Sequence, residues 1–161
     1  MRVVALRRNP TLAIGDPLCD KVLGSDTESL NTLFRESDYI LCSAPLTEET
    51  RGLIGKLQFE QAKQDAVFIN LGRGPVVDED ALIGALKTGK LKGAALYVYT
   101  VEPLPANSEL WGLENVLLSP HNMDQTATFM HEATEFFVHE NVPRFTRREP
   151  LLNPVNKNAG Y

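Results

Sequence analysis

The sequence predicts an α/β fold built on a doubly wound parallel sheet, and three observations support this class. Short apolar runs recur along the chain. They scarcely alternate with polar residues, as in strands buried on both faces of a parallel sheet. Segments with helical spacing separate them, as right-handed crossovers require. The five runs that we predict as strands are Arg2–Leu6, Tyr39–Ser43, Ala66–Asn70, Ala94–Val98 and Val116–Ser119.

Two of the intervening segments carry helix start and stop signals. Ser25 followed by Glu28 matches a capping box, which predicts a first helix. Asp78 is a suitable N-cap for a second helix, and Gly89 provides its stop. The apolar positions that share one face are Leu30, Leu33 and Phe34 in the first helix, and Ala81, Leu82, Ala85 and Leu86 in the second.

A last helical pattern starts near Asp124 and leads toward the end of the chain. Pro143 should kink or end this helix, because its ring removes a backbone donor. The polar segment Glu149–Tyr161 is predicted to be an extended tail. The apolar residues at helical spacing are Met130, Ala133 and Phe137.

Composition narrows the possible partners and locations. A chain of 161 residues with 21 acidic and 16 basic side chains predicts one globular domain that binds neither nucleic acid nor an anionic membrane surface. Cys19 and Cys42 lie in neither metal nor redox spacing, so reduced thiols are expected. The first eight residues do not resemble a secretory leader, and we expect a cytoplasmic protein.

Three chemically useful side chains follow the ends of predicted strands. Ligands of an open parallel sheet bind beyond the carboxyl ends of its strands, where Arg73, Glu102 and His121 occur. An arginine can hold a carboxylate bidentately and polarise a carbonyl, and a histidine can transfer a proton near neutral pH. A glutamate bonded to the imidazole would fix its tautomer. The set is consistent with hydride-transfer catalysis without establishing it.

Taken singly, each of these residues has a simpler explanation. Arg73 lies between two glycines and is explained as a surface arginine in a turn. His121 is explained as a loop histidine bonded to the backbone, and Glu102 before Pro103 as a cap of the following segment. Only their combination predicts a catalytic site.

Three sequence blocks resemble the D-isomer-specific 2-hydroxyacid dehydrogenase family. A further block over residues 38–54 matches as well, and the resemblance extends from the first strand to about Asn153. The three blocks are Asn70-Leu-Gly-Arg-Gly-Pro-Val-Val-Asp-Glu-Asp-Ala-Leu82, Gly93-Ala-Ala-Leu-Tyr-Val-Tyr-Thr-Val-Glu-Pro-Leu-Pro105 and Asn115-Val-Leu-Leu-Ser-Pro-His121.

The resemblance implies a Rossmann-like domain and a role for each residue of the catalytic set. Arg73 would bind the carboxylate and carbonyl of the substrate, His121 would be the general acid and base, and Glu102 would pair with His121. The implied reaction is reduction of a small 2-oxo acid by a nicotinamide dinucleotide, as in glyoxylate/hydroxypyruvate reductases. The implied assembly is a homodimer.

The resemblance also implies the cofactor site. Arg7 falls where NAD-dependent members place an acidic residue, and the pair Arg7-Arg8 suits a 2′-phosphate, which favours NADP over NAD. We expect no metal, because His, Cys, Asp and Glu form no cluster with ligand spacing. The residues predicted to contact the cofactor are Arg7, Arg8, Ala44, Pro45, Thr50, Leu71, Gly72, Arg73, Tyr97 and His121.

Two departures from the family pattern accompany these agreements. Tyr97 stands where the family has an aspartate near the nicotinamide, and no G-x-G-x-x-G phosphate loop occurs. The chain is therefore expected to lack the first strand, the glycine-rich loop and the first helix of the sheet, and to expose apolar surface and strand edges. Residues 1–148 would form a partial dinucleotide-binding domain, and residues 149–161 a tail returning to a substrate domain.

These departures leave two alternatives to catalysis open. One is a non-catalytic interaction module with a dinucleotide fold, comparable to the corepressors that the family resemblance includes. The other is an inactive fragment. Cofactor binding and turnover by the chain would distinguish both from an enzyme.

Overall fold

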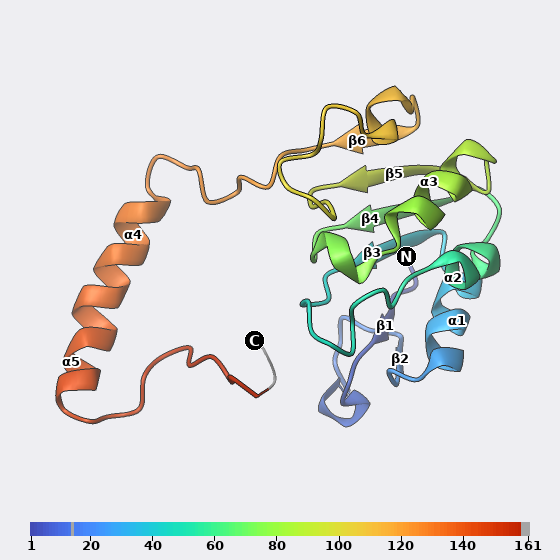
Figure 1. The fold of residues 1–161 in the computed structure, drawn as a ribbon. Helices are drawn as coiled ribbons and strands as arrows, with labels where there is room; N and C mark the ends of the chain where they lie inside the picture. Colours follow the sequence, from blue (N-terminus) through green and yellow to red (C-terminus); the bar gives the residue numbers. More distant parts are fainter. Residues whose placement is uncertain (14, 159–161) are drawn as a thin grey trace. The chain divides into compact units, whose positions relative to one another are not determined.

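The computed structural model describes residues 1–13 and 15–158, which fall into two compact units (Figure 1). The first unit comprises residues 1–120 and the second residues 121–161. The first contains the strands and three α-helices, and the second contains a helical segment followed by a tail.

The strands of the first unit are parallel throughout, which confirms the predicted α/β class. Within the described residues, β1 pairs with β2 in one sheet, and a second sheet has the order β3-β4-β5-β6. Within each sheet, consecutive strands are therefore neighbours, as crossover connections produce. The strands are β1 (Val4–Leu6), β2 (Lys21–Leu23), β3 (Tyr39–Cys42), β4 (Ala66–Asn70), β5 (Leu91–Leu96) and β6 (Val116–Leu118).

The predicted strand positions agree with the structure to within a few residues. The bounds of β4 are the predicted ones, whereas β5 begins at Leu91 rather than Ala94 and ends at Leu96 rather than Val98. The strand β2 was not predicted, because its three residues Lys21–Leu23 are too short to stand out as an apolar run.

Burial on both faces, which the unalternating runs predict, is wrong for β3. Along β3 burial alternates: Ile40 and Cys42 are buried, while Tyr39 and Leu41 are 70% and 57% exposed. Ile40 and Cys42 belong to the hydrophobic core of the first unit. In β4 the residues alternate between buried and half-buried. The expected exposure of apolar surface is thus confirmed. The helices of this unit are α1 (Thr27–Glu36), α2 (Lys56–Gln61) and α3 (Glu79–Lys87).

Aspartate side chains cap the N-termini of α1 and α3. Asp78 caps α3 as predicted, accepting a hydrogen bond from the Ala81 backbone N–H at 3.1 Å. The prediction of Ser25 as the cap of α1 is wrong. Asp26 holds that position, because its carboxylate lies 2.9 Å from the Ser29 N–H three residues on. The helix α2 was not predicted, since it has only six residues and its N-cap, Gly55, has no side chain. The Gln58 side chain instead accepts a hydrogen bond from the Gly55 N–H at 3.0 Å.

Three phenylalanines form the centre of the core of the first unit. Phe34 of α1, Phe59 of α2 and Phe68 of β4 are at most 1% exposed. Their rings meet edge to face, with centroid distances of 6.1 Å for Phe34–Phe59 and 5.4 Å for Phe59–Phe68. This cluster fixes two helices against the middle of the sheet, and it therefore fixes the strand ends that carry the candidate site.

The second unit is a helical segment in three parts: α4 (Phe129–Phe136), a π-helical turn η4 (Phe137–Asn141) and α5 (Val142–Thr146). It begins five residues after the predicted start at Asp124. Of the two outcomes predicted for Pro143, the end of the helix is wrong, because the chain remains helical to Thr146. The regular α-helix is nevertheless interrupted just before Pro143, by the π-helical turn. In η4 the Val142 N–H bonds to the Phe137 carbonyl, five residues earlier. Such a π-helical turn is an irregularity of the kind found inside α-helices, here next to a proline.

The tail after this segment contains no helix or strand between residues 149 and 158. A hydrogen bond joins the tail to η4: the Leu152 N–H donates to the side-chain oxygen of Asn141 at 2.8 Å. Within the described residues of the chain, no helix is long and apolar enough to cross a membrane.

Candidate active site

The loop that carries Arg73 is held by the side chain of Asn70, the last residue of β4. Asn70 is 2% exposed, and its side-chain oxygen accepts a hydrogen bond from the Gly72 N–H at 3.1 Å. Its amide group donates to the Arg73 carbonyl at 3.4 Å. The Arg73 side chain itself is exposed at the carboxyl end of the sheet, with one guanidinium nitrogen 2.8 Å from the Gly72 carbonyl.

The glycines on either side of Arg73 allow close backbone contacts with neighbouring loops. A Cβ on Gly72 would lie 2.6 Å from the Ala44 carbonyl oxygen. A Cβ on Gly74 would lie 1.9 Å from the carbonyl carbon of Tyr99. The Arg73 loop is therefore wedged between the loops that follow β3 and β5, and side chains at these two positions would separate them.

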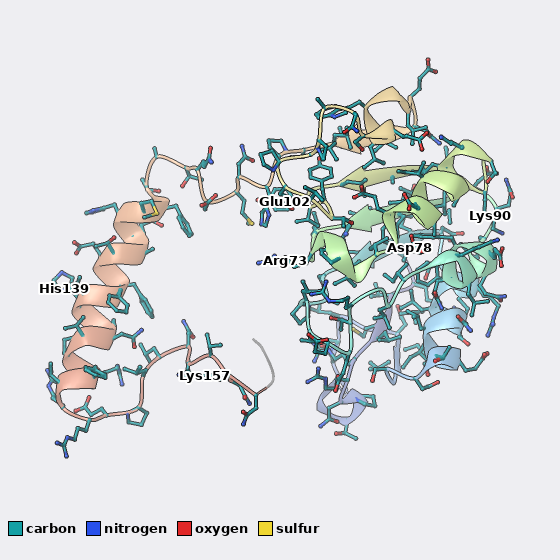
Figure 2. All side chains as sticks on the ribbon, in the orientation of Figure 1. Arg73, Asp78, Lys90, Glu102, His139 and Lys157 are labelled. Carbon is teal, nitrogen blue, oxygen red and sulfur yellow. The ribbon has the colours of Figure 1, made fainter. Side chains whose placement is uncertain are left out.

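The loop with Glu102 is closed by its own carboxylate. The Tyr99 N–H donates to Glu102 Oε1 at 3.0 Å, and the Thr100 N–H donates to Glu79 Oε2 at 3.1 Å. The peptide bond between Glu102 and Pro103 is cis. Figure 2 shows Arg73 and Glu102 at the same edge of the first unit, which is the edge formed by the carboxyl ends of β4 and β5.

Tyr99 lies between the loops of Arg73 and Glu102 and is 7% exposed. Its hydroxyl donates to the backbone carbonyls of Ser119, at 2.9 Å, and Leu96, at 3.2 Å. Burial raises the pKa of this hydroxyl above its ordinary value, and the nearby carboxylates Glu102 and Glu79 act in the same direction. Tyr99 therefore remains a neutral hydrogen-bond donor at physiological pH.

His121, the predicted general acid and base, is the first residue of the second unit. It follows the end of β6 by three residues, and the residue is exposed and takes part in an interaction. Arg73 and Glu102 are brought together within the first unit, and His121 is joined to that unit through Ser119 and Pro120.

Both predicted phosphate-binding arginines are exposed beyond the end of β1. The Arg7 backbone N–H bonds to the Leu23 carbonyl at 3.0 Å, so the main chain of Arg7 still pairs with β2. The Arg8 guanidinium lies 2.8 Å from Glu49 Oε2, with the two side chains 47% and 75% exposed. This ion pair links the loop after β1 to the loop after β3.

The loop from Pro45 to Thr50 is closed by threonine hydroxyls. Thr50 Oγ1 donates to the Pro45 carbonyl at 2.6 Å and accepts from the Thr47 N–H at 2.8 Å. Burial raises the pKa of the Cys42 thiol at the end of β3, against a smaller opposing effect of the Ala44 backbone. Cys42 is thus a neutral core residue and not a nucleophile.

Tyr97 and Leu71 are the remaining residues that the sequence predicts to contact the cofactor. The Tyr97 N–H bonds to the Asn70 carbonyl at 3.1 Å, so β5 continues its pairing with β4 to this residue. Tyr97 is half-buried. Leu71, in contrast, is 52% exposed. The described residues contain no group of three or more His, Cys, Asp or Glu side chains that could hold a metal ion.

Three residues of this site were not predicted: Asn70, Glu49 and Tyr99. An asparagine before a turn with two glycines is a known signal, because its side chain bonds the backbone two residues on. For Glu49 and Tyr99 the sequence offers no signal, because their partners lie far away along the chain. Together the loops present the exposed Arg73 and the Glu102 carboxylate on one hydrogen-bonded edge. The guanidinium suits recognition of a small anionic carbonyl compound.

Comparison with known proteins agrees with this arrangement. Residues 1–122 match the family model described as D-isomer specific 2-hydroxyacid dehydrogenase, NAD binding domain. The chain is 55% identical over 92 residues to glyoxylate/hydroxypyruvate reductase B of Erwinia tasmaniensis, covering 57% of this chain and 29% of the relative. It is 41% identical over 138 residues to glyoxylate reductase of Korarchaeum cryptofilum, covering 86% of this chain and 41% of the relative. The chain thus spans less than half the length of these relatives.

Solved structures share the fold along the chain. A D-isomer specific 2-hydroxyacid dehydrogenase from Xanthobacter autotrophicus, in complex with NADPH and MES, superposes with a TM-score of 0.81 at 34% identity, covering 100% of this chain and 73% of that one. An NADPH-dependent glyoxylate/hydroxypyruvate reductase from Sinorhizobium meliloti, in complex with NADP and sulfate, gives 0.82 at 28% identity, covering 100% and 50%. The resemblance seen in the sequence blocks is confirmed, and the chain belongs to the D-isomer specific 2-hydroxyacid dehydrogenase family.

Proposed function

We propose that the protein takes part in the NAD(P)H-dependent reduction of a small 2-oxo acid, of the kind that glyoxylate and hydroxypyruvate represent. The observation that carries this proposal is the joint presentation of Arg73 and Glu102 on one hydrogen-bonded edge of the sheet. An exposed guanidinium there can bind a carboxylate and an adjacent carbonyl oxygen together. The names of the two relatives support the substrate class.

The proposed roles divide the chemistry among three residues. Arg73 binds the substrate carboxylate and polarises the carbonyl that is reduced. His121 donates a proton to the developing alkoxide, a task that suits an imidazole near neutral pH. Glu102 pairs with His121, holds one tautomer and stabilises the cationic form. The proton lost from His121 returns from solvent after the product leaves.

The residues at the sheet edge suit a nicotinamide dinucleotide with a 2′-phosphate. Arg8 offers a guanidinium whose ion pair with Glu49 is exposed, and such a surface pair is weak enough for a phosphate to replace it. The further residues that would hold the cofactor are Arg7, Ala44, Pro45, Thr50, Leu71, Gly72, Arg73, Tyr97 and His121. When bound, the reduced cofactor would supply the hydride.

Fluorescence titration of the purified 161-residue protein with NADPH and NADH tests cofactor binding. We expect NADPH to bind more tightly than NADH. Arg8→Gln should lower the ratio of the two affinities roughly tenfold, because a charge-assisted bond to phosphate is lost. Arg51→Gln is the matched control, since it removes an exposed arginine that has no proposed role. Equal affinities for both cofactors would overturn the NADP assignment.

Turnover is tested with glyoxylate, hydroxypyruvate and pyruvate, following NADPH oxidation. Arg73→Gln should raise KM for the oxo acid and lower kcat, whereas His121→Gln should act mainly on kcat. If the wild-type protein neither binds a cofactor nor turns over any of the three acids, the proposed function is wrong.

We further propose that residues 1–148 serve as a dinucleotide-binding domain, that residues 149–161 contact a substrate domain, and that the protein acts as a cytoplasmic homodimer. The exposed apolar side chains of Tyr39, Leu41 and Leu117 support association. Light scattering after size exclusion would contradict the dimer if the mass were that of one 17.9 kDa chain.

A further inference from the structure

We propose that Tyr99 is a positioning residue that joins the three chain segments of the candidate active site. The inference rests on the proposed function for its catalytic meaning. Its structural content is independent of that function: one buried tyrosine links the Arg73 loop, the Glu102 loop and the strand end that precedes His121.

The backbone of Tyr99 makes the first two links. Gly74, next to Arg73, packs so closely on the peptide between Tyr99 and Thr100 that a Cβ would lie 2.4 Å from the Thr100 nitrogen. On its other side, the Tyr99 N–H donates to the Glu102 carboxylate at 3.0 Å. The positions of the Arg73 backbone and of the Glu102 carboxylate are therefore coupled through this one residue.

The hydroxyl of Tyr99 makes the third link. It bonds to the Ser119 carbonyl at 2.9 Å and to the Leu96 carbonyl at 3.2 Å. The Ser119 N–H already bonds to the Leu96 carbonyl at 2.9 Å, so the hydroxyl adds a second link, to the Ser119 carbonyl, between the ends of β5 and β6. Ser119 stands two residues before His121, and Pro120 between them restricts rotation of the backbone. Holding the Ser119 carbonyl therefore restrains the chain where it leads into His121.

Removing the hydroxyl group alone distinguishes the positioning role of Tyr99 from its packing in the core. The ring of Tyr99 belongs to the hydrophobic core, and phenylalanine would fill the same space. Only the oxygen can donate to the Ser119 carbonyl. Tyr99→Phe therefore removes the link to the Ser119 carbonyl while the ring and both backbone links remain.

The test compares Tyr99→Phe with Tyr39→Phe, which removes a hydroxyl from a tyrosine that is 70% exposed. In ¹H–¹³C NMR spectra of the 161-residue protein without ligand, Tyr99→Phe should shift the imidazole signals of His121 and leave those of His139 unchanged. Tyr39→Phe should shift neither histidine. Unchanged His121 signals in Tyr99→Phe would overturn the proposal.

Kinetics provide the second readout. Tyr99→Phe should lower kcat for oxo-acid reduction roughly tenfold with less than a twofold change in the KM for NADPH, because misplaced catalytic groups slow the chemical step. Wild-type kcat in Tyr99→Phe would count against the positioning role. If the wild-type protein has no turnover, the proposed function fails, and the His121 signals alone decide the role of Tyr99.

Discussion

The seven phenylalanines of the chain divide between two regions with opposite environments. In the first unit, Phe34, Phe59 and Phe68 are at most 1% exposed and stack edge to face. In the helical segment of the second unit, the four phenylalanines are between 41% and 74% exposed. These four are Phe129, Phe136, Phe137 and Phe145.

The difference shows that helical spacing of apolar residues does not by itself bury them. Leu30 and Phe34 occur at helical spacing on α1, as Met130, Ala133 and Phe137 do in the second unit. Within the first unit, α1 lies against β1, β2 and the neighbouring helix α2. The residues of α4, η4 and α5 include none that is buried. Stability should therefore be concentrated in the first unit.

The largest expected effect contrasts one phenylalanine from each region. Phe59→Ala should lower the free energy of unfolding by about 3–5 kcal/mol, since it leaves a cavity between α2 and β4. Phe137→Ala should change it by less than about 0.5 kcal/mol. Urea denaturation followed by the fluorescence of Trp111, the single tryptophan, measures both. Equal losses in the two variants would contradict the division into a packed and an unpacked region.

A second contrast uses glycines of the first unit. Gly74→Ala should cost about 1–3 kcal/mol, because its Cβ would meet the Tyr99 carbonyl carbon at 1.9 Å and the two loops would have to separate. Gly84→Ala, inside α3, meets nothing within 4 Å and should gain about 0.5–1 kcal/mol. Thermal unfolding of both variants measures the effect. A stabilised Gly74→Ala protein would show that the contact between the Arg73 and Tyr99 loops is not tight.

A smaller effect is expected at the helix caps, which differ between the regions. Asp78→Ala should destabilise the first unit by about 1 kcal/mol, since it removes the bond to the Ala81 N–H. Thr128→Ala should have an effect below about 0.5 kcal/mol, because Thr128 makes no side-chain cap bond at the start of α4. Circular dichroism during urea unfolding compares the two, and a larger loss in Thr128→Ala would reverse the expected order.

The smallest effect concerns the pH dependence of the cap of α1. Hydrogen bonds from the hydroxyl and the backbone N–H of Ser29 hold the pKa of Asp26 below its ordinary value of 3.8. This contribution is present above pH 3.8 and is lost as the pH falls through the lowered value of the folded state. Asp26→Asn keeps a cap that does not titrate.

Helicity measured by circular dichroism between pH 5 and pH 2 should therefore fall more in the wild-type protein than in Asp26→Asn. Asp16→Asn controls for the removal of a carboxylate outside the helices. Identical acid titrations of the wild-type protein and Asp26→Asn would contradict a lowered Asp26 pKa.

Much of the first unit could be predicted because its signals are local. The apolar run Ala66–Asn70 is a strand with those bounds, and Asp78 caps α3, since each depends on neighbours along the chain. The short strand β2 and the short helix α2 give little local signal and were missed. Pro143 does not end the helix, which was one of its two predicted effects, because the segment stays helical through a π-turn before it.

The side chains of the candidate site could be predicted from the sequence, but the contacts that hold their loops together could not. Arg73, Glu102 and His121 follow strand ends, and parallel strands bring such ends to one edge of the sheet. Their supports depend on contacts between segments: Gly74 against Tyr99, Arg8 against Glu49, and the Tyr99 hydroxyl against Ser119. Such pairs are separated by tens of residues and leave no periodic pattern.

The sequence by itself determined the α/β class, the family and the identity of the three candidate catalytic side chains, because apolar periodicity and motif spacing are properties of neighbouring residues. Only the tertiary structure decided which apolar faces are covered and which residues hold the site together. Ile40 is buried while Leu41 beside it is exposed. The physical reason is that burial and hydrogen bonding between segments require a partner surface, which no single stretch of sequence specifies.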